Sequence, residues 1–108
     1  MRLHEFIEKF IAKNTIVRLW KPEIKGKPYM GYKMLTKEKG VMEWEILDIP
    51  ELNDILVIHI TDIVCAKNRE AVNIVIDTDY DRDDMIQIFE EQDKQRCKNK
   101  MCMCEGKI

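Results

Sequence analysis

The sequence predicts an α+β domain with an N-terminal helix, an antiparallel sheet of about five strands and a C-terminal helix. Apolar residues with helical spacing open the chain, segments rich in β-branched and aromatic residues fill its middle, and a second helical pattern follows an acidic stretch. A chain of 108 residues supports one hydrophobic core. We expect residues 1–96 to form a single domain and the basic, Cys- and Met-containing residues 97–108 to form a flexible tail.

The first helix is expected over residues 2–13. Its apolar residues recur three and four positions apart, which places them on one face of a helix. Asn14 follows, and asparagine tolerates the left-handed conformation that ends many helices. The residues of the apolar face are Leu3, Phe6, Ile7, Phe10 and Ile11.

Five later segments have the composition of strands. They are residues 15–21, 29–36, 41–47, 56–65 and 71–78. The last two are apolar on both faces over part of their length, so we expect them near the centre of the sheet. Two helices cover one face of such a sheet but hardly both, and some apolar surface should remain for a partner or a second copy. The candidates for this surface are Val17, Leu19, Val57 and Val75.

Residues 41–47 alternate in the way typical of a half-buried antiparallel strand. Met42, Trp44 and Ile46 would lie on one face of the strand. Glu43 and Glu45 would lie on the other, and we expect them to face solvent.

The acidic stretch 77–84 leads into the second helix, which should end near residue 94 or 96. Asp81 or Asp83 can cap this helix, because a carboxylate near a helix N-terminus meets free N–H groups and the positive end of the dipole. The apolar residues that indicate the helix are Met85, Ile86, Ile88 and Phe89.

Charge is segregated along the chain, although the net charge is only −2. Residues 1–40 carry ten Lys and Arg against four acids, residues 41–93 carry three against fifteen, and residues 94–108 carry five against one. The chain therefore reads as a basic arm, an acidic body and a basic tail. Such asymmetry indicates binding steered by charge.

Catalysis and cofactor binding are disfavoured. The chain has no serine, which excludes serine-nucleophile schemes. His4 and His59 are the only near-neutral acid–base groups, and Cys65 would lie about 20 Å from His59 along one extended strand. The four glycines never form a phosphate-binding loop. We expect no catalytic residue and no cofactor.

No metal site is expected either. The run 77–84 begins like an EF-hand loop, but Arg82 stands where the turn needs glycine and Ile88 where the loop needs glutamate. A helix cap or an acidic docking surface explains the run instead. We expect the cysteines near the C-terminus to be free thiols, although the sequence leaves metal binding by them open. They are Cys97, Cys102 and Cys104.

The sequence indicates a cytoplasmic protein. No apolar run is long enough to span a membrane. Glu5, Glu8 and Lys9 interrupt the apolar residues that a signal peptide would need.

Four strand segments resemble small uncharacterised proteins carried by bacterial phages and other mobile elements. The segments are residues 16–20, 41–45, 60–63 and 70–76, with the sequences IVRLW, VMEWE, ITDI and EAVNIVI. The resemblance implies a setting of host–phage conflict, in which small proteins, anti-CRISPR proteins among them, often act as stoichiometric inhibitors with acidic surfaces. It assigns no role to any single residue.

The sequence thus leads to the hypothesis of a non-enzymatic, protein-binding inhibitor of phage or mobile-element origin. An acidic body would be steered toward the Lys- and Arg-lined groove of a host nucleic-acid-handling complex. The expected partner is a host protein or ribonucleoprotein complex, with no membrane involved. The residues expected to bind it are Glu43, Glu45, Asp79, Asp81, Asp83 and Asp84.

Two alternatives stay open. The basic arm could bind nucleic acid, because cations meet phosphates and aromatic rings stack on bases. The acidic body could also meet the basic arm of a second copy, head to tail, in a homo-oligomer. The residues of the nucleic-acid alternative are Trp20, Lys25, Lys27, Tyr29 and Lys33.

Overall fold

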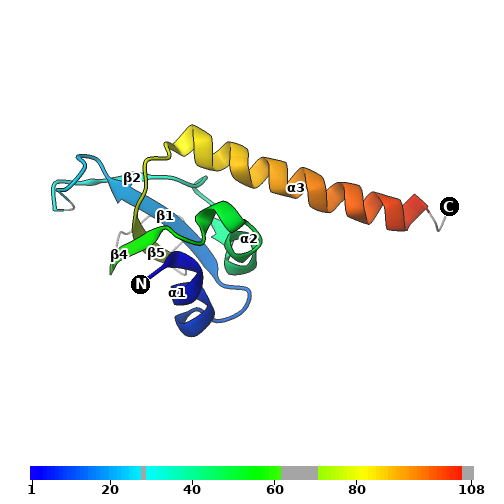
Figure 1. The fold of residues 1–108 in the computed structure, drawn as a ribbon, viewed down its shortest axis with the longest axis horizontal. Helices are drawn as coiled ribbons and strands as arrows, with labels where there is room; N and C mark the ends of the chain where they lie inside the picture. The colour runs from blue at the N-terminus through cyan, green and yellow to red at the C-terminus, as the bar shows by residue number, and fades with distance from the viewer. Residues whose placement is uncertain (28, 62–70, 106–108) are drawn as a thin grey trace.

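A computed structural model describes residues 1–27, 29–61 and 71–105 of the chain, with side chains at 1–27, 29–60 and 71–95. It confirms the predicted α+β class, with a helix at each end and a five-stranded sheet between them (Figure 1). In chain order the elements are α1 (Leu3–Phe10), β1 (Ile16–Pro22), β2 (Tyr32–Met34), β3 (Val41–Met42), α2 (Glu43–Leu47), a 3₁₀ turn η1 (Pro50–Leu52), β4 (Leu56–Thr61), β5 (Val72–Asp77) and α3 (Arg82–Glu105).

The sheet is mostly antiparallel, as predicted, but one central pair is parallel. The strand order is β2-β1-β5-β4, and β3 also pairs with β1. Strands β1 and β5 run parallel, with Leu19 opposite Ile74 and Trp20 opposite Val75. Parallel neighbours need a long crossover, and here the chain passes through β2, β3, α2 and β4 before it returns as β5. Pairing at this sequence separation leaves no local signature.

The predicted strand over residues 41–47 is wrong beyond Met42, where the chain turns into α2. The Glu45 carboxylate accepts a hydrogen bond from the Met42 N–H at 2.7 Å. The Glu43 carboxylate accepts hydrogen bonds from the backbone N–H groups of Trp44 and Asn14. The bonds from Met42 and Trp44 satisfy N–H groups at the start of α2. The bond from Asn14 ties this start to the segment between α1 and β1. A short alternating run fits one helical turn as well as a strand, since Glu43 and Ile46 are three apart and both buried.

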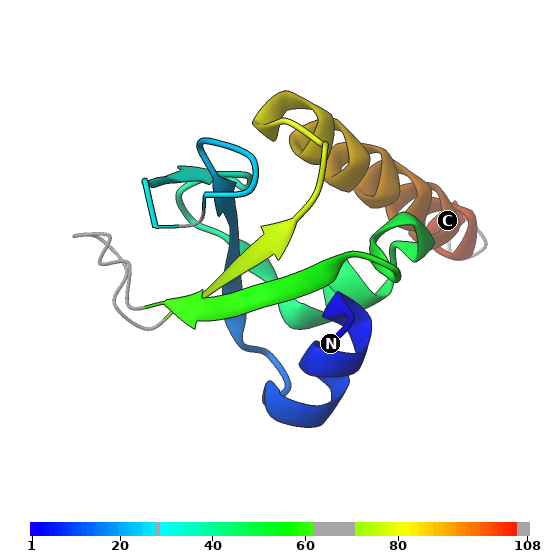
Figure 2. The ribbon, with the colours of Figure 1, turned by 60° about the vertical axis from the view of Figure 1, so that its left-hand side comes forward.

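The main core lies on one face of the sheet, where α1, α2 and the first turns of α3 gather (Figure 2). Val17, Leu19 and Val75 are fully buried and Val57 is half-buried, so the expected exposed surface is not formed by these residues. The buried residues of the core are Leu3, Ile7, Val17, Leu19, Leu35, Ile46, Ile49, Leu52, Ile74, Ile76, Met85 and Phe89.

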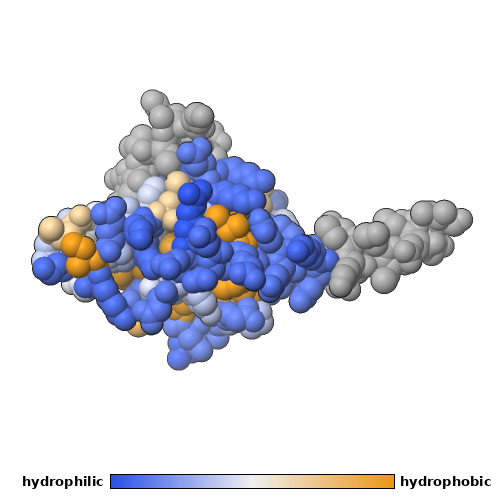
Figure 3. Space-filling view, turned by 90° about the horizontal axis from the view of Figure 1, so that it is seen from above, coloured by the Kyte–Doolittle hydropathy of each residue, from blue (hydrophilic) through white to orange (hydrophobic). Residues whose placement is uncertain are grey.

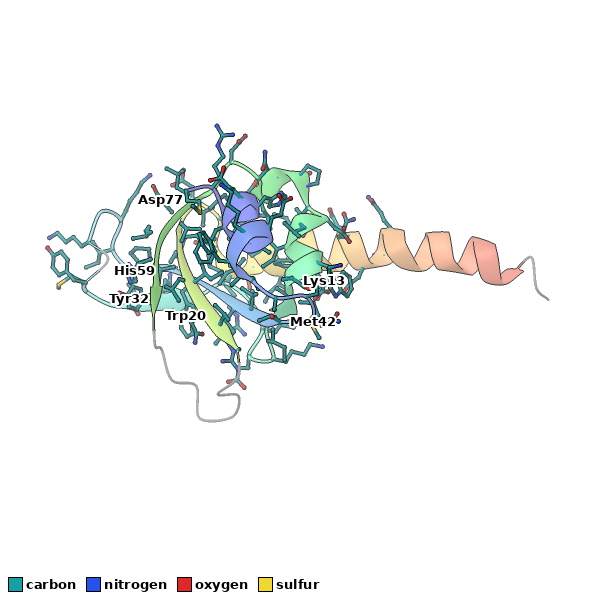
Figure 4. All side chains as sticks on the ribbon, turned by 90° about the horizontal axis from the view of Figure 1, so that it is seen from below. Lys13, Trp20, Tyr32, Met42, His59 and Asp77 are labelled. Carbon is teal, nitrogen blue, oxygen red and sulfur yellow. The ribbon has the colours of Figure 1, made fainter. Side chains whose placement is uncertain are left out.

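The opposite face of the sheet is held by polar bonds. Trp20, Val75 and His59 lie in register on β1, β5 and β4, so they share this face. The Trp20 indole N–H donates to the Asn73 side-chain oxygen at 2.9 Å. The Tyr32 hydroxyl lies 2.8 Å from His59 Nε2 and links strands from the two edges of the sheet (Figure 4). Trp20, on the same face, is 8% exposed.

Helix α3 extends to Glu105, past the predicted end near residue 96. Its second half runs beyond the rest of the molecule (Figure 1). With this helix included, the molecule measures 54 Å along its longest axis. The flexibility expected of residues 97–108 stays a prediction. Residues 62–65 of the predicted fourth strand lie outside the described residues. Within the described part of the chain, no helix is both long and apolar enough to cross a membrane.

Candidate protein-binding surface

Two of the predicted acidic residues, Asp79 and Asp81, meet the basic arm at one end of the molecule. The connection from β5 to α3, residues 77–81, faces the end of β1 and the loop that follows it, residues 21–26. Together they line a cavity of about 470 Å³ at the carboxyl ends of the parallel pair β1 and β5. We call this cavity the charged cleft. Its charged residues are Lys21, Glu23, Lys25, Lys33, Asp77, Asp79 and Asp81.

Backbone and side-chain bonds order the connection before α3. The Tyr80 N–H donates to the Thr78 hydroxyl at 3.2 Å. The Asp81 N–H donates to the Asp84 carboxylate at 3.2 Å, and the Met85 N–H donates to the Asp81 carbonyl at 3.0 Å. An acidic side chain therefore caps α3, as the sequence indicates, but that side chain belongs to Asp84. The Asp81 carboxylate is left to pair with Lys21.

Two ion pairs cross the charged cleft. Lys21 Nζ lies 3.1 Å from Asp81 Oδ1, and Lys25 Nζ lies 2.9 Å from Asp79 Oδ1. The hydrogen bond and the charge of Asp79 raise the pKa of Lys25, and the same contact lowers the pKa of Asp79. The Asp79 and Asp81 side chains stay 88% and 73% exposed.

Ion pairs within the chain give an explanation for the segregation of charge along the sequence. Arg2 pairs with Asp54 at 3.7 Å and Lys37 with Glu90 at 3.4 Å, so further cations of residues 1–40 meet acids of residues 41–93. The basic arm thus neutralises part of the acidic body within one chain. Head-to-tail association with a second copy is not required to explain the charge pattern.

Glu43 and Glu45 do not join the other predicted acids. Both lie at the start of α2, where their carboxylates bond to backbone N–H groups, and Glu43 is buried. Each lines a hollow other than the charged cleft. Asp79, Asp81 and Asp84 instead share the start of α3. The six acids therefore fall into two separate groups.

The residues of the nucleic-acid alternative also lie in different surroundings. Trp20 is buried and its N–H is bonded inside the sheet, so it offers no stacking face. Tyr29 is 76% exposed in the loop between β1 and β2. Lys27 and Lys33 are exposed, whereas Lys25 pairs with Asp79.

The described side chains show no metal site. No group of three or more His, Cys, Asp or Glu among them could hold an ion. Cys97, Cys102 and Cys104 lie beyond the described side chains, so the expectation of free thiols stays a prediction. His59 is bonded to Tyr32 as a member of the sheet.

Sequence reasoning missed the role of Lys21 and Ile58, which also line the charged cleft. Lys21 ends the apolar part of β1, and no local pattern separates it from the other lysines of the arm. On the face that Figure 3 presents, the described surface is mostly hydrophilic, with apolar side chains in small separate patches.

Comparisons with protein-family models, with curated proteins and with solved structures find no match for this chain.

Proposed function

We propose that this protein is a non-enzymatic, protein-binding inhibitor of phage or mobile-element origin that acts in the cytoplasm. It would place the acidic start of α3 against a basic surface of a host complex that handles nucleic acid. The acids that form this contact are Asp79, Asp81, Asp83 and Asp84. One observation carries the proposal: these acids are exposed, and hydrogen bonds order the connection that bears them.

The ion pairs with the basic arm are compatible with such a contact. Exposed ion pairs contribute little to stability, because water screens them and two flexible side chains lose freedom. A partner arginine could therefore replace Lys25 at Asp79 with small loss. Arginine would also gain a bidentate bond that lysine cannot make. Glu43 and Glu45 play no part in this proposal, since their carboxylates serve α2.

A capture experiment tests the proposal. The variant Asp79→Asn, Asp81→Asn, Asp83→Asn removes three charges from the surface. We expect it to lose a bacterial protein that the unmodified chain retains from lysate, as identified by mass spectrometry.

A matched variant removes three exposed acids elsewhere and should retain the same protein. Its substitutions are Glu8→Gln, Glu51→Gln and Glu91→Gln, all at exposed positions. Equal loss in both variants would show that only net charge matters. Equal retention would place the binding surface outside the start of α3.

Nucleic-acid binding is the second candidate, and the exposure of Tyr29 beside Lys27 favours it. The acids of the charged cleft oppose it, because they would repel phosphates close to the same loop. Fluorescence anisotropy with labelled single- and double-stranded DNA separates the candidates. Binding that weakens steeply with salt and is lost in Tyr29→Ala, Lys27→Ala would favour nucleic acid over the inhibitor.

A further inference from the structure

A second cavity lies between α1 and α2 and shares no residue with the charged cleft. The two helices lie side by side (Figure 2 and Figure 4), and the segment that follows α1 also lines the cavity. Its volume is about 360 Å³, within the range of roughly 300–1,000 Å³ that is typical of small-molecule sites. Its wall is mostly apolar, and the apolar residues are Ile7, Ile11, Trp44 and Leu47.

Glu43 brings a buried carboxylate to this cavity. The residue is only 5% exposed, yet it lines the cavity. Its Oε1 accepts a hydrogen bond from the Asn14 N–H, and its Oε2 accepts one from the Trp44 N–H. A carboxylate oxygen can accept two hydrogen bonds. Each oxygen of Glu43 therefore keeps the capacity to accept another bond.

The negative charge of Glu43 has no cation beside it. None of the ion pairs among the described side chains includes Glu43. Lys13 also lines the cavity, but its side chain is exposed and forms no ion pair with Glu43. Buried charges in proteins are as a rule paired, because an unpaired charge in apolar surroundings is costly. Two backbone N–H bonds offset part of this cost, and a cation in the cavity would offset more.

Trp44 adds an aromatic surface to the same cavity. It is 41% exposed and precedes the apolar turn that ends with Leu47. Among aromatic side chains, tryptophan attracts a cation over its ring most strongly. A carboxylate, an indole and aliphatic walls are together the groups that recognise a positively charged nitrogen on an apolar body.

We propose that this cavity binds a small organic ammonium ion. The charged nitrogen would lie beside the Glu43 carboxylate, and the apolar body would lie against Ile7, Ile11 and Leu47. An anion of the same size would be repelled by Glu43, and a neutral molecule would leave its charge unpaired. This inference is independent of the proposed function, because the cavity contains none of the acids at the start of α3.

NMR titration of the full chain with three matched compounds tests the proposal. Phenethylammonium, phenethyl alcohol and phenylacetate share a ring and differ in charge. We expect the ammonium compound to shift the indole N–H signal of Trp44 and to bind about tenfold more tightly than the alcohol. Phenylacetate should bind more weakly than the alcohol. The Trp20 indole N–H, which is bonded to Asn73 inside the sheet, should not shift.

Two glutamine substitutions make the test specific. Glu43→Gln removes the buried charge, and we expect it to weaken phenethylammonium binding about tenfold while phenethyl alcohol binds as before. Glu8→Gln removes the same charge from an exposed side chain that lines the same cavity. It should bind all three compounds like the unmodified chain. Circular dichroism checks the fold of both variants, and if Glu43→Gln does not fold, the three compounds on the unmodified chain decide.

Four outcomes would overturn the proposal. The unmodified chain could show no saturable binding of phenethylammonium at millimolar concentration. Phenethyl alcohol could bind as tightly as the ammonium compound, which would make the cavity merely apolar. Glu8→Gln could weaken binding as much as a folded Glu43→Gln. A short peptide with lysine between two leucines could bind more tightly than phenethylammonium, which would assign the cavity to a lysine of another protein.

Discussion

The two faces of the sheet bury their residues by different means. On the helix-covered face, apolar side chains such as Leu19 and Ile74 fill space between sheet and helices. On the other face, Trp20 is buried with its N–H bonded to Asn73, and Tyr32 reaches His59 across the sheet. The first face depends on volume and the second on matched donors and acceptors. Hydrophobic periodicity detects the first kind of face only, which is why Trp20 looked like an exposed stacking residue.

The largest effect is expected from a cavity in the helix-covered face. Ile74 is fully buried between Leu19 and Ile60 in the sheet register. Ile74→Ala should lower the free energy of unfolding by about 2–5 kcal/mol, the cost of lost burial plus the cavity left behind. Urea unfolding measures it. Ile24→Ala is the same change at an exposed site and should alter stability by less than about 1 kcal/mol. Similar losses in both variants would mean that Ile74 is not in a packed core.

The next effect comes from the hydrogen-bonded face. Asn73→Ala removes the acceptor of the Trp20 N–H and leaves that donor buried. We expect a loss of about 1–3 kcal/mol in the free energy of unfolding. In Trp20→Phe the donor is absent, so adding Asn73→Ala should cost less there. Equal costs in both backgrounds would show that the two side chains act independently.

The Tyr32–His59 link should have a smaller effect. Tyr32→Phe removes the hydroxyl that lies 2.8 Å from His59 Nε2 and keeps the ring. We expect a loss of about 0.5–1.5 kcal/mol and a change in the imidazole NMR signals of His59. Tyr29→Phe removes an exposed hydroxyl and should change neither quantity. If Tyr32→Phe also changes neither, the link between Tyr32 and His59 does not stabilise this face.

Much of the fold was predictable from local patterns, because those patterns reflect burial. The apolar stripe of α1 and the apolar runs of β1 and β5 place their elements within a few residues. Longer-range features were not predictable. Pairing of β1 with β5 is decided by the whole core, and the position of β4 at an edge follows from it. Its apolar run suggested a central strand, yet Ile58 and Ile60 are exposed.

The candidate surface was predictable in composition but not in arrangement. Asp79 and Asp81 lie where a strand-to-helix connection should place them, exposed at the start of a helix. Their pairing with Lys25 and Lys21 depends on β1 and β5 ending at the same edge. Glu43 was misplaced because its carboxylate accepts hydrogen bonds from the Trp44 N–H in α2 and from the Asn14 N–H, which is distant in the sequence.

The smallest effect on stability is expected from the exposed ion pair between Lys25 and Asp79 in the charged cleft. Lys25 lowers the pKa of Asp79, so the ion pair favours the folded state fully above the ordinary aspartate pKa, and this contribution is lost as the pH falls through the lowered value. In Lys25→Ala the pKa of Asp79 should rise toward its ordinary range, as measured by NMR titration of the carboxyl group. Lys27→Ala removes another exposed cation of the same loop and should leave the pKa of Asp79 unchanged.

An Asp79 pKa that responds equally to both lysine variants would mean that the field of the whole loop acts, rather than one contact. A response to Lys25 alone would define a specific cation position in the charged cleft. That position lies at the surface, where breaking the pair costs little stability. Because displacing Lys25 from Asp79 costs little stability, a cation of a binding partner could take its place. The buried hydrogen bond between Trp20 and Asn73, in contrast, serves only to stabilise the fold.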